Sequence, residues 1–286
     1  MDPSASAAQR CYRHPDREAY ISCQRCERLI CPECMRDASV GFQCPSCVSE
    51  GAATIRRPRT IAGGRISSRP GVVTYTIIGL NVAVFVLTDL LRIDVINVAG
   101  SMISGSVLSN GTVYPGVVDG GYWRLLTSEV LHNGPTHLLF NMMALYLFGT
   151  FVESKLGAVR YVAAYLTMAV GSSVFVYWLS GPFQPTVGAS GAVFGLLGLA
   201  LMLLLKARED VRGLLVLLAI NAAISAFVPQ ISWQGHLGGF VVGCALGAVF
   251  AWAPARHRQS LQILMWVVVW TAIVAATALR TVVLTS

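Results

Sequence analysis

Seven long apolar stretches after residue 70 constrain this 286-residue chain more than any other feature. Most of them reach the roughly 17–25 residues that a helix needs to cross a hydrocarbon core about 30 Å thick. Hydrophobic residues make up 55% of the chain and charged residues 12%, which is too apolar for a soluble domain of this size. We therefore expect an all-α polytopic membrane protein with seven transmembrane helices, over residues 72–91, 135–153, 159–179, 188–206, 211–228, 236–253 and 261–283.

The basic residues between the apolar stretches are distributed unevenly. If the chain crosses the membrane seven times, one side receives most of them, namely Arg56, Arg57, Arg59, Arg65, Arg69, Lys155, Arg160, Lys206, Arg208, Arg212, Arg256 and Arg258. By the positive-inside rule that side is cytoplasmic. We expect a multi-pass protein of the cell membrane with a cytoplasmic N-terminus and an external C-terminus. The rule also accounts for the formal net charge of +7, so we expect no nucleic-acid partner.

Three regions differ in composition. Residues 1–50 hold seven of the eight cysteines, and residues 51–70 are rich in Gly, Pro, Ser and Arg without apolar periodicity. The sequence predicts a small N-terminal metal-binding domain over 1–50, a flexible basic linker over 51–70 and a membrane domain over 71–286. About 40 residues separate the first two apolar stretches, which is long for a loop without a function.

Metal binding is indicated by four pairs of ligand residues, each with a two-residue gap. They are Cys11 with His14, Cys23 with Cys26, Cys31 with Cys34 and Cys44 with Cys47. Two such pairs complete a tetrahedral shell, so the eight ligands predict two structural zinc ions with no position open to water. A disulfide framework is the alternative. The N-terminus lacks the apolar core of a secretory signal, which favours a reducing compartment and therefore metal.

This cysteine pattern resembles the treble-clef and B-box-like zinc domains, which commonly interleave their pairs. The resemblance implies that Cys11, His14, Cys31 and Cys34 hold one ion and that Cys23, Cys26, Cys44 and Cys47 hold the other. Spacing alone leaves sequential pairing open. A domain of this size with little apolar core is expected to fold only with metal bound and to dock a cytoplasmic protein partner.

Polar residues inside the apolar stretches are the candidates for chemistry, because such residues are costly in a bilayer. Ser190 lies between glycines in Gly188-Ala189-Ser190-Gly191, and it is either a helix-packing residue or a nucleophile. His236 opens another helix at similar depth and could act as its base. His137 and Asn141 share one helix face and, with the backbone N–H of Ser190, could stabilise an oxyanion. No acidic residue is near His236 in sequence, so we expect a Ser–His dyad.

This arrangement resembles the rhomboid family of intramembrane serine proteases over about residues 70–255. The resemblance rests on the Gly188-Ala189-Ser190-Gly191 motif, on His236, on His137 with Asn141, on the pair Trp123-Arg124 and on Glu153 before Lys155. It implies a six-helix core, to which this chain adds a seventh helix and the zinc domain. Bacterial members often have a tyrosine four residues after the serine, where its ring stacks on the histidine. This chain has Phe194, which keeps the ring and loses the hydroxyl.

Other residues near the motifs have structural interpretations. Trp123, Arg124 and Glu153 are expected to be structural even in an enzyme, and Cys244 is most simply a small buried residue. Gly239 and Gly243 are expected to let their helix approach the helix of Ser190 closely. His132 is either a loop residue or a neighbour of the oxyanion site.

The sequence thus predicts an intramembrane serine endopeptidase that needs no cofactor for catalysis. We expect it to cleave transmembrane segments of other proteins near the outer face of the bilayer through an acyl-enzyme on Ser190. Substrates with helix-destabilising residues are favoured, because a hydrogen-bonded helix hides its scissile carbonyl. One alternative is a catalytically inactive relative that binds or routes membrane clients. A transporter would instead show paired charges at mid-membrane and repeated halves, and neither is evident.

Overall fold

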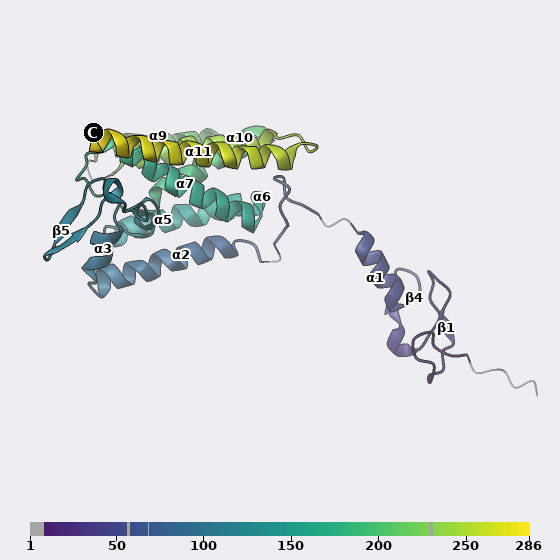
Figure 1. The fold of residues 1–286 in the computed structure, drawn as a ribbon. Coiled ribbons are helices and arrows are strands. Elements are labelled where there is room, and N and C mark those ends of the chain that lie inside the picture. The colour runs from purple at the N-terminus through teal and green to yellow at the C-terminus, as the bar shows by residue number, and fades with distance from the viewer. Residues whose placement is uncertain (1–8, 56–57, 68, 229–230) are drawn as a thin grey trace, which may run out of the picture. The chain divides into compact units, whose positions relative to one another are not determined.

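The computed structural model describes residues 9–55, 58–67, 69–228 and 231–286, and the chain divides into two compact units, Met1–Pro58 and Arg59–Ser286 (Figure 1). The boundary between them falls within the predicted linker over 51–70. On one side of it, helix α1 (Pro45–Thr54) continues into that segment. On the other side, Ala62 is fully buried against the membrane unit.

The N-terminal unit is built from two short hairpins and one helix. Strands β1 (Ile21–Ser22) and β2 (Leu29–Ile30) pair antiparallel, as do β3 (Arg36–Asp37) and β4 (Phe42–Gln43). A 3₁₀ turn, η1 (Pro32–Cys34), lies between the hairpins. The buried core of this unit consists of six cysteines with Ala19 and Ile30. So small an apolar core is typical of domains that depend on metal for their stability.

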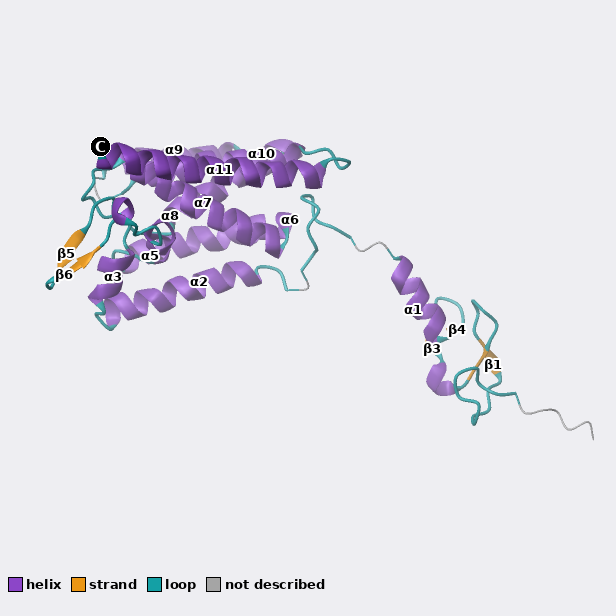
Figure 2. Ribbon diagram, viewed as in Figure 1, coloured by secondary structure: helices purple, strands orange, loops and turns teal. Residues whose placement is uncertain are grey.

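All seven predicted apolar segments form helices in the membrane unit (Figure 2). Within the described residues, six are long and apolar enough to cross a membrane. Two of these include a π-helical segment. The six spans are α2 with η2 (Val72–Leu90), α5 with η5 and α6 (Pro135–Leu156), α7 (Ala158–Leu179), α8 (Ser190–Ala207), α10 (Trp233–Trp252) and α11 (Arg258–Thr285).

The seventh helix, α9 (Arg212–Phe227), is shorter than predicted. It has 16 residues, which at 1.5 Å per residue gives about 24 Å, less than a hydrocarbon core of about 30 Å. The described residues therefore provide six full-length spans where the sequence predicted seven. A crossing by α9 remains a prediction.

Helix α8 lies in the interior of the bundle, with α7 and α10 packed against it. Of the residues in the most apolar part of α8, 67% are buried inside the protein, whereas the share for α11 is 11%. A Cβ at Gly239 would overlap the carbonyl oxygen of Gly191, and one at Gly243 would overlap that of Gly195. The predicted close approach of these two helices is therefore confirmed.

The long connection between α2 and α5 is folded rather than irregular. It contains α3 (Asp94–Gly100), a hairpin of β5 (Val107–Ser109) with β6 (Thr112–Tyr114), the 3₁₀ turns η3 (Val117–Asp119) and η4 (Ser128–Val130), and α4 (Arg124–Thr127). In Figure 1 the hairpin lies at the same end of the bundle as the C-terminus.

Two of the residues expected to be structural hold this connection together. The Arg124 guanidinium is fully buried and donates to the carbonyls of Pro115, Val98 and Ser101 at 2.7–2.9 Å. The indole of Trp123 donates to Ala99 O at 3.0 Å. These bonds satisfy carbonyls that would otherwise be unpaired in a compact loop.

Glu153, the third of these residues, joins two helices at the opposite end of the bundle. Its carboxylate accepts from the backbone N–H groups of Val73 and Thr74 at 3.2 and 2.9 Å, and from Thr74 Oγ1 at 2.8 Å. A carboxylate at this position caps the free N–H groups of α2 and interacts favourably with its positive end.

Candidate active site

Ser190 is the first residue of α8, and the turn before it brings a histidine close. Gly188 has φ +129°, a conformation that L side chains rarely adopt, and its N–H donates to Ser128 O at 2.9 Å. A Cβ at Gly188 would lie 2.7 Å from the His137 ring and 3.6 Å from Ser190 Oγ. The glycine therefore allows the imidazole of His137 and the hydroxyl of Ser190 to face the same small space.

His236 lies in the first turn of α10, which Ser232 caps by accepting from Gly235 N at 3.3 Å. The Nδ1 atom of His236 is 2.8 Å from the hydroxyl of Ser225 on α9. Phe194, one turn after Ser190, stacks on the imidazole with 4.0 Å between ring centroids and 9° between planes. Both contacts orient the ring, and the bond at Nδ1 leaves Nε2 as the nitrogen available for proton transfer.

No hydrogen bond between Ser190 Oγ and His236 occurs within the part of the chain that the structure describes. The two residues are nonetheless held on adjacent helices, since Phe194 lies on the same face of α8 as Ser190 and stacks on His236. Long or missing nucleophile–base bonds are common in enzymes without bound substrate. Ser190 and His236 thus lie on adjacent helices, without a hydrogen bond between their side chains in the described residues.

The predicted oxyanion residues lie together on α5. His137 Nδ1 accepts from the backbone N–H of Asn133 at 3.2 Å, so its Nε2 is directed at the space beside Gly188. The Asn141 amide donates to His137 O at 3.0 Å, which leaves its second N–H available. His132 packs edge-on against His137, with 5.1 Å between ring centroids. Of the two interpretations of His132, the structure thus favours a neighbour of this site.

A pocket next to Ser190 extends toward α7 and away from the histidines. It is lined by Ser128, Glu129, Ser172, Ser190 and Gly235, among others, and neither His137, Asn141 nor His236 is in its lining. Hydroxyl and carboxyl groups in such a position can hydrogen-bond water. The pocket therefore offers a polar space beside the serine within an otherwise apolar bundle.

Glu129 is a residue of this site that the sequence analysis missed. It is 4% exposed, accepts from the backbone N–H of Ala192 at 3.1 Å, and lies 3.3 Å from Ser172 Oγ. Burial raises the pKa of its carboxyl to about 8. In the sequence, Glu129 is an acidic residue in a largely apolar stretch just before α5, which could have marked it as a site residue. It was not considered because this stretch was predicted to be a loop.

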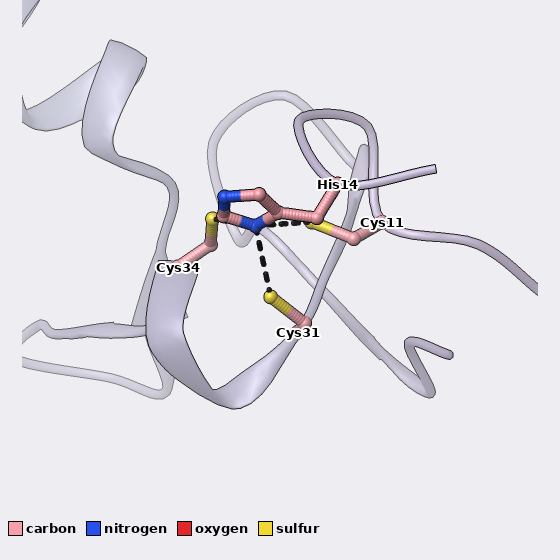
Figure 3. A group of neighbouring side chains, drawn as sticks. All are labelled: Cys11, His14, Cys31 and Cys34. Atoms are coloured by element: carbon pink, nitrogen blue, oxygen red, sulfur yellow. Dashed lines mark hydrogen bonds between the residues drawn. The ribbon is translucent and has the colours of Figure 1, made fainter. Parts of the chain in front are cut away.

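The N-terminal unit contains two clusters of potential metal ligands. Their ligand atoms lie within 4.8 Å of one another in each cluster. The first brings together Cys11, His14, Cys31 and Cys34 (Figure 3), and the second brings together Cys23, Cys26, Cys44 and Cys47. The structure therefore has the interleaved grouping, and sequential pairing is excluded.

The donor geometry of both clusters fits a tetrahedral metal ion. His14 Nδ1 is 3.3 Å from Cys31 Sγ and 3.4 Å from Cys34 Sγ, and Cys26 Sγ is 3.7 Å from Cys44 Sγ. Ligands about 2.0–2.3 Å from a central zinc would be separated by distances of roughly this size. Backbone N–H groups also donate to the sulfurs, as Cys44 N does to Cys23 Sγ at 3.2 Å. Such bonds stabilise thiolates that bind metal.

Known proteins resemble this chain over the membrane unit. A family model described as Rhomboid domain matches residues 119–253. "Rhomboid protease GluP" of Bacillus subtilis is 34% identical over 202 residues, which are 67% of this chain and 38% of that protein. "Putative rhomboid protease YdcA" of the same organism is 35% identical over 136 residues, 46% of this chain and 68% of the relative. "Rhomboid protease AarA" of Providencia stuartii is 24% identical over 214 residues, 65% and 74% of the two chains.

Proposed function

The chain belongs to the rhomboid family, and we propose that it is an intramembrane serine endopeptidase that cleaves transmembrane segments of other membrane proteins. The relatives that are named as rhomboid proteases support this activity. Because the chain spans only 38% of the length of one of them, the activity of the whole protein is inferred chiefly from its own site.

The proposed reaction starts with attack of Ser190 Oγ on the carbonyl carbon of the scissile peptide bond. His236 Nε2 takes the hydroxyl proton and later gives it to the leaving amine, which yields an acyl-enzyme. Water then attacks the ester, again with His236 as base, and releases the new carboxyl terminus. Ser225 has the role of orienting the imidazole through Nδ1. This is a Ser–His dyad without a carboxylate.

The negative charge on the carbonyl oxygen needs donors during both steps. We assign this role to the His137 imidazole, the second N–H of Asn141 and the backbone N–H of Ser190, with a further contribution from the positive end of the α8 dipole. His137 faces the same space as Ser190 beside Gly188. No cofactor takes part in this reaction.

The observation that carries the proposal is the stacking of Phe194 on His236. This contact holds His236, in the first turn of α10, against the face of α8 on which Ser190 lies. A serine that served only for helix packing would not require an imidazole oriented by two separate contacts. The alternative, an inactive protein that binds membrane clients, would not require it either.

The test is covalent labelling of the full-length protein in detergent with a serine-directed fluorophosphonate. Ser190 should be labelled, Ser190→Ala should abolish labelling, and His236→Ala should lower it strongly. Asn141→Ala should lower the cleavage rate about 10–1000-fold, as expected for a lost oxyanion donor. Cleavage of single-span membrane proteins by the Ser190→Ala variant would contradict the proposal. Absence of labelling in folded wild-type protein would favour the client-binding alternative.

We further propose that the two clusters of the N-terminal unit bind zinc, with Cys11, His14, Cys31 and Cys34 at one ion and the remaining four cysteines at the other. Thiolate and imidazole ligands suit zinc, and a cytoplasmic location keeps the thiols reduced. With four protein ligands at each ion, the metal would be structural. The unit would then present a folded surface to a cytoplasmic protein partner.

A further inference from the structure

Three arginines converge at one end of the membrane unit, outside the active site. A Cβ placed on Gly63 would lie 3.7 Å from Arg258 Nη1 and 3.9 Å from Arg160 Nη2. The third arginine, Arg59, donates from Nη1 to Gly63 O at 3.3 Å. Two guanidinium groups thus lie within 4 Å of one point, and a third is bonded to the backbone at that point.

These three positive charges have no acidic partner in the described part of the chain. The salt bridges found there join Arg17 to Asp16 and to Glu33, all in the N-terminal unit. The guanidinium groups of Arg59 and Arg258 are both close enough to repel that of Arg160. In addition, Arg258 Nε is buried without a hydrogen-bond partner. Clustered like charges with an unpaired buried donor are unfavourable unless an anion compensates them.

Hydrogen bonds from neighbouring residues hold the arginine cluster in place. Gln262 on α11 accepts from Arg160 Nε at 2.9 Å and donates to Ala62 O at 3.0 Å. Thr60 Oγ1 donates to Leu156 O at 3.3 Å and accepts from Gly64 N at 2.9 Å. These bonds tie residues 60–64 to α11 and α6, and they tie Arg160 of α7 to α11. The arginines are therefore brought together by the fold and not by chance encounters of mobile surface side chains.

The position of the cluster relates it to the membrane. Arg160 lies in the first turn of α7, and Arg258 is the first residue of α11. Both helices are long enough to span a bilayer, and their N-terminal ends carry the positive end of the helix dipole. In Figure 1 the start of α11 and the end of α6 lie at the end of the bundle away from the C-terminus. Residues at the ends of spanning helices are at the depth of lipid headgroups.

We propose that Arg59, Arg160 and Arg258 form a binding site for the phosphate group of an anionic phospholipid. Guanidinium groups recognise phosphate through paired N–H donors, and basic pockets between membrane helices on the cytoplasmic side suit anionic headgroups. A free phosphate ion offers the same chemistry. The depth of the site at the helix ends favours the lipid, whose acyl chains would lie along the bundle.

The experiment is native mass spectrometry of the delipidated full-length protein, titrated with phosphatidylglycerol or with phosphatidylcholine. We expect phosphatidylglycerol to bind at least tenfold more tightly. Arg258→Gln should remove most of this preference, because it deletes a guanidinium while leaving the contacts of Gln262 in place. Arg212→Gln removes an exposed arginine at the start of α9 and serves as the matched control.

Several outcomes would overturn the proposal. They are equal binding of the two lipids, unchanged binding in Arg258→Gln, or an equal loss in Arg212→Gln, which would indicate general charge attraction. Inorganic phosphate that displaced the lipid at similar concentration would identify a free-anion site instead. If Arg258→Gln fails to fold, Arg160→Lys retains the charge and loses the paired donors, and it should weaken lipid binding. None of these readouts depends on proteolytic activity.

Discussion

The ring of Phe194 lies face to face with the imidazole of His236, with 4.0 Å between their centroids and 9° between their planes. Phe194 is the position at which bacterial rhomboids often have tyrosine, so the stacking expected from the resemblance is confirmed in a chain that lacks the hydroxyl. The side chain is 8% exposed and belongs to a small apolar cluster with Leu197, Leu201 and Leu214. Its ring therefore contributes both packing and orientation of the histidine.

The first prediction separates these two contributions. Phe194→Tyr should retain most of the Ser190 labelling rate, whereas Phe194→Ala should lower it strongly, because the imidazole loses a stacking contact worth about 0.5–1.5 kcal/mol. Phe194→Leu is the matched control, since it retains an apolar side chain without an aromatic face. Labelling rates and thermal stability should be measured together. Equal rates for the leucine and tyrosine variants would remove the role of stacking.

The second prediction concerns Glu129 and pH. Its pKa is raised to about 8 by burial, so the carboxyl is neutral below that pH and ionised above it. A negative charge beside the first turn of α8 would offset the positive helix end that stabilises the oxyanion. The rate of Ser190 labelling in wild type should therefore fall as pH rises through about 8. In Glu129→Gln, where no ionisation occurs, this fall should be absent.

Folding stability provides a separate check on the same carboxyl. Because its pKa is higher in the folded state than in the unfolded chain, the folded protein binds this proton more tightly. Its contribution to stability should be present at low pH and should be lost as pH rises from about 4.5 to 8. Glu209→Gln changes an exposed glutamate that lies two residues beyond the end of α8. It is the control and should behave as wild type. Identical pH profiles for wild type and Glu129→Gln would contradict the assignment.

The sequence predicted the features that depend on local pattern. Apolar runs and glycine spacing gave the helices and the contact between α8 and α10, because a residue without Cβ is required wherever two helix backbones meet. Four pairs of ligand residues, each with a two-residue gap, predicted two metal sites, whereas the interleaved grouping was implied only by the resemblance to known zinc domains. Each of these patterns can be recognised within a short stretch of sequence.

Features that depend on contacts between distant segments could not be read in this way. Glu129 reaches the backbone of Ala192, and Ser225 reaches His236 from a different helix. Neither contact has a signature in its own segment. The length of α9 was also misjudged, since apolar composition continued beyond the residues that are helical. Arg59, Arg160 and Arg258 were recognised as topological signals, but their convergence over Gly63 required the fold.

The third prediction concerns topology. The basic residues between the apolar helices indicate that the end of the bundle next to residues 59–65 is cytoplasmic and that the C-terminus is external. A reporter fused after residue 60 should therefore be active on the cytoplasmic side, and one fused after residue 286 on the outside. If both reporters face the same side, α9 does not cross the membrane. In that case the side of the membrane on which Ser190 and His236 lie would also have to be reassigned.

The fourth prediction concerns the metal clusters. Elemental analysis of the full-length protein should give two zinc ions per chain, because each cluster supplies four ligand atoms within 4.8 Å. Cys26→Ala should lower the content by one ion and should leave the Cys11, His14, Cys31 and Cys34 cluster loaded. His14→Cys should retain both ions, since a thiolate replaces the imidazole in the same shell. One ion or none in the wild type would reject the assignment of eight ligands.

Cobalt substitution makes this prediction specific to each cluster. Thiolate and imidazole ligands give different absorption spectra, so the wild type should show a mixed signal from one site with three cysteines and a histidine and one with four cysteines. In His14→Cys the two sites should become alike. Chelation should unfold the N-terminal unit, because its core consists mainly of the ligands themselves. Labelling of Ser190 should survive chelation, since all of the proposed catalytic residues belong to the other unit. Loss of labelling together with the metal would instead mean that the N-terminal unit controls the active site.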